Sequence, residues 1–106
     1  MTEYRVYVIE LDKGVSRKSK FRKANPDYQG VKPCVYVGHT AKTPEERFAQ
    51  HSAGKRSSSF VKQHGIRLKP KLYERYQPSA TRKEAEAKEQ WLAEKIRSRG
   101  YGVWWN

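Results

Sequence analysis

One strand with apolar side chains on both of its faces constrains this fold more than any other feature. Residues 4–11, YRVYVIEL, are rich in β-branched and aromatic side chains, a composition typical of strands. Because successive side chains point to opposite faces of a strand, both faces of this one need cover from other elements. We therefore expect residues 4–11 to form a central strand of a sheet.

Two further strands are indicated by the same kind of pattern. CVYVG at residues 34–38 predicts a second strand, and the long connection that precedes it favours antiparallel pairing with the first. Within LKPKLYERY, the residues near 71–76 predict a third strand.

A capping signal fixes the start of the first helix. Thr43 can cap the helix, Pro44 suits its first turn, and Glu46 completes a capping box. We expect this helix to begin at residue 44 and to run to about Gly54.

A second capping signal opens the last helix. Thr81 is followed three residues later by Glu84, and Gly100 ends the helix. A short helical turn is expected at residues 59–64, and YGVWWN finishes the chain as an extended segment.

The balance of charges points to nucleic acid as the partner. Twenty-three lysines and arginines against eleven acids give the 106-residue chain a net charge of +12, which would hold a polyanion without reading its sequence. The single cysteine, Cys34, excludes an internal disulfide and a thiolate-rich zinc site. With no bilayer-spanning apolar run and no secretory signal, we expect a soluble, cytoplasmic protein without a membrane partner.

Residues 13–33 separate the first two strands and carry the densest positive charge. We expect a long basic loop here, because loops of this length are usually functional or disordered. The charge favours a role in holding phosphates, and a solvated, disordered insertion is the alternative. The residues that we assign to nucleic-acid binding are Lys13, Arg17, Lys18, Lys20, Arg22 and Lys23.

Glu89 interrupts the apolar stripe of the last helix. It falls on the same helical face as Ala85, Leu92 and Ile96. Burial of a carboxylate is costly unless a cation or several donors compensate it, so basic residues or a metal ion are expected to face Glu89. The alternative is a glutamate at the edge of the stripe whose carboxylate reaches solvent.

Arg47 and His51 lie one turn apart on the first helix, on the same side of Phe48. A guanidinium and an imidazole at this edge can clamp a phosphate and pass a proton, and an ordinary surface pair is the alternative. Tyr7 and Tyr36 lie on the first two strands, where packing alone would also explain them.

The other two histidines, His39 and His64, have no partner at a metal-ligand spacing. We expect them at the surface or close to nucleic acid. His39 is therefore assigned to nucleic-acid binding, together with Lys55 and Arg56 of the basic connection KRSSSF.

The order of these residues resembles the GIY-YIG nuclease family over most of the chain. The resemblance rests on VYV at 6–8, YVG at 36–38, RFAQH at 47–51 and KEAEAKEQWL at 83–92. Two features depart from the family pattern. Arg5 and Val6 stand where glycine and isoleucine would precede the tyrosine, and the connection between the two tyrosine motifs is longer than usual.

The resemblance implies a fold and a role for each site residue. The fold would be a small α/β sandwich, a single domain over residues 1–106 with a three-stranded, mainly antiparallel sheet flanked by helices. Glu89 would ligate one Mg²⁺ or Mn²⁺ ion, and Arg47 would balance charge at the transition state. Tyr7 would orient or deprotonate the attacking water, helped by Tyr36 or His51. The family's additional asparagine would correspond to Asn106.

The implied function is metal-dependent endonucleolytic hydrolysis of phosphodiester bonds in nucleic acid, with DNA as the expected substrate. Two alternatives are a catalytically inactive nucleic-acid-binding module on the same scaffold and an RNA-associated structural protein. The full set of tyrosines, arginine, histidine and glutamate favours the nuclease, because a binding protein would not need a carboxylate that faces phosphate.

Overall fold

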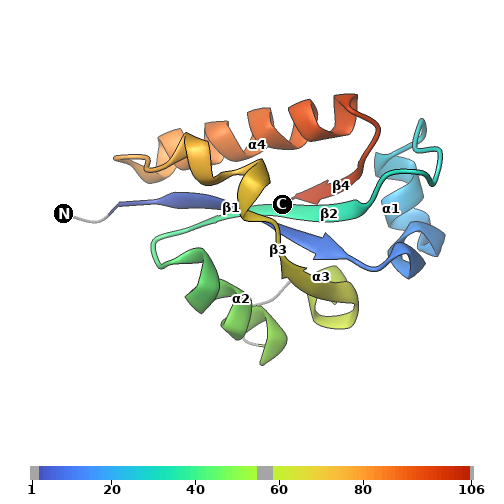
Figure 1. Cartoon of the computed structure of the whole chain (residues 1–106), viewed down its shortest axis with the longest axis horizontal. Helices are drawn as coiled ribbons and strands as arrows, with labels where there is room; N and C mark the ends of the chain where they lie inside the picture. Colours follow the sequence, from blue (N-terminus) through green and yellow to red (C-terminus); the bar gives the residue numbers. More distant parts are fainter. Residues whose placement is uncertain (1–2, 55–58, 106) are drawn as a thin grey trace.

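A mixed sheet of four strands with helices on both faces organises the part of the chain that the computed structural model describes, residues 3–54 and 59–105 (Figure 1). The strands are β1 (Arg5–Leu11), β2 (Cys34–Thr40), β3 (Gly65–Leu68) and β4 (Gly102–Trp105). Their order across the sheet is β3-β1-β2-β4. β1 pairs antiparallel with β2 and with β3, whereas β2 pairs parallel with β4.

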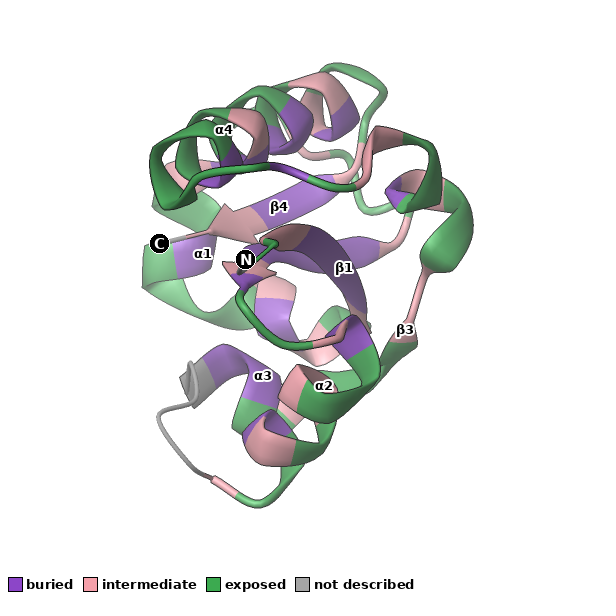
Figure 2. Cartoon of the chain, turned by 90° about the vertical axis from the view of Figure 1, so that its left-hand side faces the viewer, coloured by how far each residue is buried: buried purple, intermediate pink, exposed green. Residues whose placement is uncertain are grey.

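The central position of β1 confirms the prediction from its two apolar faces. Its residues Val6, Tyr7, Val8 and Ile9 are all buried. Figure 1 shows α4 (Arg82–Ser98) across one face of the sheet, and α2 (Pro44–Ser52) and α3 (Ser59–His64) against the other. Buried residues accordingly gather on β1 and β4 and on the inward side of α4 (Figure 2).

Both predicted helix caps are present. The Thr43 hydroxyl accepts a hydrogen bond from the Glu46 N–H, and the Thr81 hydroxyl accepts one from the Glu84 N–H, each at 3.1 Å. Gly100 follows α4 with a φ of +97°, a left-handed conformation that glycine adopts without strain. None of the helices in the described ranges is long and apolar enough to span a membrane.

The predicted third strand at residues 71–76 is wrong. Two 3₁₀ turns, η2 (Pro70–Leu72) and η3 (Glu74–Tyr76), occupy these residues, and the strand β3 lies just before them. Pro70 has no N–H to give to a neighbouring strand, so sheet pairing ends at Lys69, whose N–H donates to the Val8 carbonyl.

The extended segment at the end of the chain is a strand of the sheet. β4 returns after α4 and pairs with β2 in parallel, with Val35 opposite Val103 and Tyr36 opposite Trp104. The α/β class with helices on both faces is therefore confirmed, and the sheet has four strands instead of the expected three.

The segment expected to be a long basic loop, residues 13–33, holds a 3₁₀ helix and an α-helix, η1 (Lys13–Arg17) and α1 (Ser19–Ala24). Val15 and Phe21 are completely buried, and the Phe21 ring packs edge-on against Phe60 at 6.0 Å between centroids. The segment is therefore part of the hydrophobic core. Its charged side chains masked this role, because two apolar residues six positions apart give no periodic signal.

Candidate active site

Tyr7 and Tyr36 lie on neighbouring strands and face the same side of the sheet. Tyr7 of β1 pairs directly with Gly38 of β2, and Tyr36 precedes Gly38 by two residues, so its side chain has the same orientation. The two rings lie 6.2 Å apart between centroids. A Cβ atom at residue 38 would lie 2.5 Å from the Tyr7 hydroxyl oxygen. Gly38 is therefore required for the tyrosine of the neighbouring strand to occupy its place.

α2 places His51 against both tyrosines. The imidazole is 0% exposed, and its Nε2 lies 2.9 Å from the Tyr7 hydroxyl. Its ring meets the Tyr36 ring edge-on at 5.6 Å. One turn earlier, Arg47 lies beside a cavity that is described below, and it donates a hydrogen bond to Gln50. The two residues predicted to share an edge of the helix therefore do so, and His51 enters the core.

Burial sets the protonation states of this cluster. It raises the pKa of Tyr7 well above the usual value for a phenol, with Tyr36 adding to the rise and Arg47 opposing it. Burial and then Glu89 raise the pKa of Tyr36 to about 12. Burial and then the charge of Arg47 lower the pKa of His51 to about 4. Near neutral pH, therefore, Tyr7 is a phenol that can donate its proton to the Nε2 of a neutral His51.

Glu89 is buried on α4 and has a partner on the sheet. Its side chain is 6% exposed, and its Oε2 lies 3.1 Å from Nδ1 of His39, which belongs to β2. The alternative of a glutamate whose carboxylate extends into solvent is therefore wrong. His39, expected at the surface or close to nucleic acid, is half-buried at the end of β2, beside α4.

One cavity of about 420 Å³ joins these side chains. The strands contribute Tyr7, Tyr36 and His39, and α2 contributes Arg47. Four further lining residues did not stand out in the sequence. They are Arg82, Glu86 and Gln90 of α4 and Trp105 of β4. Their residue types and local spacing are ordinary for an exposed helix face and an apolar strand, so only the packing of α4 and β4 reveals them.

Other residues predicted to bind nucleic acid lie elsewhere. Lys13, Arg17, Lys18, Lys20, Arg22 and Lys23 are exposed on η1 and α1, and none of them lines this cavity. Their segment lies at the far end of β1 and β2 from α2 (Figure 1). Lys55, Arg56 and Asn106 fall outside the described residues. His64 is half-buried, and its Nδ1 lies 3.2 Å from both carboxylate oxygens of Asp12.

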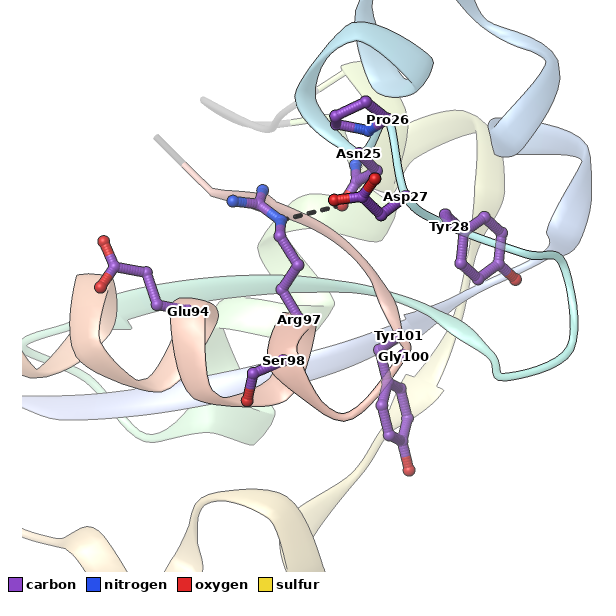
Figure 3. A pocket seen from close by; sticks show the side chains of 9 residues that line it. All are labelled: Asn25, Pro26, Asp27, Tyr28, Glu94, Arg97, Ser98, Gly100 and Tyr101. Carbon is purple, nitrogen blue, oxygen red and sulfur yellow. Dashed lines mark hydrogen bonds between the residues drawn. The ribbon is translucent and has the colours of Figure 1, made fainter.

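A second cavity, of about 450 Å³, lies at the other end of α4 (Figure 3). Its wall includes Asn25 and Arg97, whose side chains are hydrogen-bonded to each other at 3.0 Å. The Asn25 amide also accepts from the Val103 N–H and donates to the Val103 carbonyl. The Arg97 guanidinium donates to the same carbonyl at 3.1 Å. The polar side chains of this wall therefore form the hydrogen bonds that the backbone at the outer edge of β4 needs.

The first cavity suits a hard divalent cation. Within the described ranges, no three His, Cys, Asp or Glu side chains gather as a complete metal cage. Mg²⁺ needs no such cage, because it keeps several waters and binds through one or two carboxylates together with substrate phosphate. Glu89 offers one such carboxylate at the cavity wall, held by His39. The donor set therefore fits Mg²⁺ or Mn²⁺ with Glu89 as a ligand.

Comparison with known proteins gives one match. The family model of the GIY-YIG catalytic domain covers residues 6–102 of the chain. This range begins in β1 and reaches β4, and it includes all the residues of the first cavity except Trp105. No curated protein and no solved structure matches the chain significantly.

Proposed function

The chain belongs to the GIY-YIG family of nuclease domains, and from this premise we propose that it is a metal-dependent endonuclease that hydrolyses phosphodiester bonds in DNA. The observation that carries the proposal is that Tyr7, Tyr36, Arg47 and Glu89 line one cavity, with His51 buried behind it against the Tyr7 hydroxyl. A binding surface would have no use for a buried tyrosine–histidine pair and a carboxylate at the same place.

Tyr7 and His51 form a path for the proton of the attacking water. The water oxygen forms a bond to phosphorus and gives its proton to the Tyr7 oxygen. Tyr7 passes its own proton across 2.9 Å to Nε2 of His51. The bond from phosphorus to the leaving oxygen breaks, and that oxygen takes up a proton from solvent. His51 then returns its proton to Tyr7, which releases one to solvent, and the resting pair is restored. The pair therefore removes a proton without a free phenolate at rest, which the raised pKa of Tyr7 disfavours.

Arg47 supplies positive charge at two points. Its charge lowers the pKa values of Tyr7 and Tyr36, against the effect of burial, so it stabilises negative charge that develops on the phenol oxygens. Across the same cavity it can bind the phosphate oxygens as charge accumulates on them at the transition state.

Glu89 would hold the divalent ion, with His39 fixing the orientation of its carboxylate. When bound, such an ion neutralises charge on the phosphate and on the leaving oxygen. A single protein ligand leaves the remaining coordination positions to water and substrate.

The replacement Glu89→Gln tests the proposal. Gln keeps the volume of the side chain against Leu92 and Ala85 but removes the charge that anchors the ion, so cleavage should be lost while the fold remains. Affinity for nucleic acid without metal should stay equal or rise slightly, because a carboxylate that repels phosphate is gone. The assay uses labelled single-stranded, duplex and branched DNA and RNA with Mg²⁺, Mn²⁺ or EDTA. Glu94→Gln, on an exposed position of the same helix, is the matched control.

Two outcomes would contradict the proposal. Equal cleavage by the wild type and Glu89→Gln in both metals would remove Glu89 from the metal site. Binding of all substrates by both proteins, with cleavage by neither, would make the chain a binding module on a nuclease scaffold. Cleavage of RNA but not DNA would overturn the substrate assignment alone.

A further inference from the structure

A basic surface with an exposed aromatic ring lies on the C-terminal half of α4 and on the 3₁₀ turns beside it. A small cavity there, of about 160 Å³, has four cations and no acidic residue in its lining. We call it the basic-aromatic surface. It consists of Lys71, Arg75, Tyr76, Trp91, Lys95 and Arg99. It shares no residue with the cavity around Glu89.

The four cations of this surface are not neutralised by carboxylates. Within the described ranges, the ion pairs involve other cations, such as Arg67 and Lys69 with Glu10. Lys71, Arg75 and Arg99 are exposed. A cluster of positive charges is unfavourable in itself, because like charges repel. The charge is therefore available to an anionic partner, and a polyanion such as a phosphate backbone would relieve the repulsion.

Trp91 is held in position and yet exposed. The side chain is 47% exposed, and its ring packs against Tyr76 at a centroid distance of 5.2 Å, nearly perpendicular to it. Lys95 fixes the pair, because its Nζ lies 4.8 Å from the Trp91 centroid and donates to the Tyr76 hydroxyl at 2.9 Å. A large ring that is restrained but uncovered suits stacking, since little conformational freedom is lost when a second ring packs on it.

The partner that this combination fits is a single strand. Cations bind the phosphates of any nucleic acid, but a stacking platform needs an open base face, which a duplex offers only at its ends. The surface lies on the same helix as the first cavity but on another face, because Trp91 follows Glu89 by two residues, a rotation of about 200° around α4. One helix therefore carries both surfaces.

We propose that the basic-aromatic surface binds a single-stranded segment of nucleic acid, with phosphates on Arg75, Arg99 and the neighbouring lysines and a base stacked on Trp91. The inference rests on the proposed function for the class of its partner, but not on cleavage. It implies that the preferred substrate has a single-stranded part that can reach this face of α4.

Binding of a fluorescein-labelled fifteen-nucleotide dT strand tests the inference, measured by anisotropy in EDTA over a series of salt concentrations. Trp91→Ala should weaken binding by about ten-fold, the effect of removing one stacked base. Arg75→Gln combined with Arg99→Gln should lower the slope of log affinity against log salt by about 0.7 for each phosphate that is no longer bound. Arg67→Gln is the control for each arginine, because it removes one positive charge from an arginine that is paired with Glu10. Thermal unfolding of each variant checks that the fold is intact.

Two results would overturn the inference. The Trp91 and arginine variants could bind the single strand as tightly as Arg67→Gln does. Trp91→Ala could weaken binding to a blunt, closed-end duplex as much as binding to the single strand, which would show general electrostatic attraction. A variant that loses affinity only because it unfolds would appear in the thermal scan, and the exposed arginines then decide the question. Because every measurement is made without metal, failure of the proposed nuclease activity would leave the binding result unchanged.

Discussion

The two large cavities beside α4 have nearly equal volumes, about 420 and 450 Å³, but their polar groups do different things. In the cavity around Glu89, two arginines, two carboxylates and two tyrosines line the wall, where a substrate can reach them. In the cavity around Asn25, the amide and the Arg97 guanidinium bind the backbone of β4. Size therefore does not identify the site. The partners of the polar groups do: around Glu89 they are other side chains, and around Asn25 they include the backbone of β4.

The two regions are neighbours, separated by one stacked pair. The Arg97 guanidinium lies 4.8 Å from the centroid of the Trp105 ring, and Trp105 lines the cavity around Glu89. We therefore expect substitutions in the two cavities to have different effects, although the cavities are close together. Substitutions on one side should change cleavage, and substitutions on the other should change stability.

The largest effect is expected for Arg47→Ala, which should slow cleavage by about 1,000-fold while binding weakens only mildly. The charge acts mainly at the transition state and on the developing phenolate, so the barrier rises more than the ground state. Single-turnover cleavage rates measured with metal report the barrier, and affinities measured in EDTA report binding in the ground state. Arg47→Lys should restore little, because lysine lacks the planar fork of guanidinium donors. Near-complete rescue by lysine would reduce the role of Arg47 to that of a local charge.

A smaller effect is expected for Asn25→Ala, and it concerns stability instead of cleavage. The change leaves the buried Val103 N–H and the Arg97 Nε without their acceptor, the Asn25 amide oxygen, so the free energy of unfolding should fall by about 3 kcal/mol. The Val103 carbonyl keeps its bond from Arg97. Chemical denaturation measures this decrease, and cleavage per folded molecule should not change. Asp27→Asn, at an exposed position of the same cavity, is the control and should leave both quantities unchanged. If Asn25→Ala lost cleavage but kept its full stability, the contrast between the two cavities would be wrong.

The smallest effect is a pH dependence of stability that comes from His51. Its pKa is about 4 in the folded protein and near 6.5 in the unfolded chain. Between these values the unfolded state binds more protons, so the contribution of His51 to stability is present above pH 6.5 and is lost as the pH falls toward 4. Urea unfolding at several pH values, compared with His51→Gln, isolates this slope from the other titrating groups. A difference between the two proteins that does not vary with pH would mean that His51 is not buried in its neutral form.

Local signals in the sequence located one of these regions and missed the other. Thr43 and Thr81 begin their helices as predicted, and Tyr7, Tyr36, Arg47 and Glu89 line one cavity with His51 behind Tyr7. The caps can be read within a few residues, whereas the site set came from the resemblance in the order of its residues along the chain. Phe21 and Asn25 gave no such signal, because their surroundings in sequence are polar and basic. Their place in the core depends on Phe60 and Val103, far along the chain.

The sequence by itself determined the central strand, the starts of α2 and α4, and which side chains could carry out the chemistry, because capping and side-chain periodicity are set by near neighbours. Only the tertiary structure decided that β4 joins β2 in parallel, that residues 13–33 close the core, and that His39 orients Glu89. It also decided that Trp91 and four cations share one surface on α4 and the turns beside it. These outcomes depend on interactions between segments far apart in the chain, whose free energy is gained only when the whole sheet and its helices are packed together.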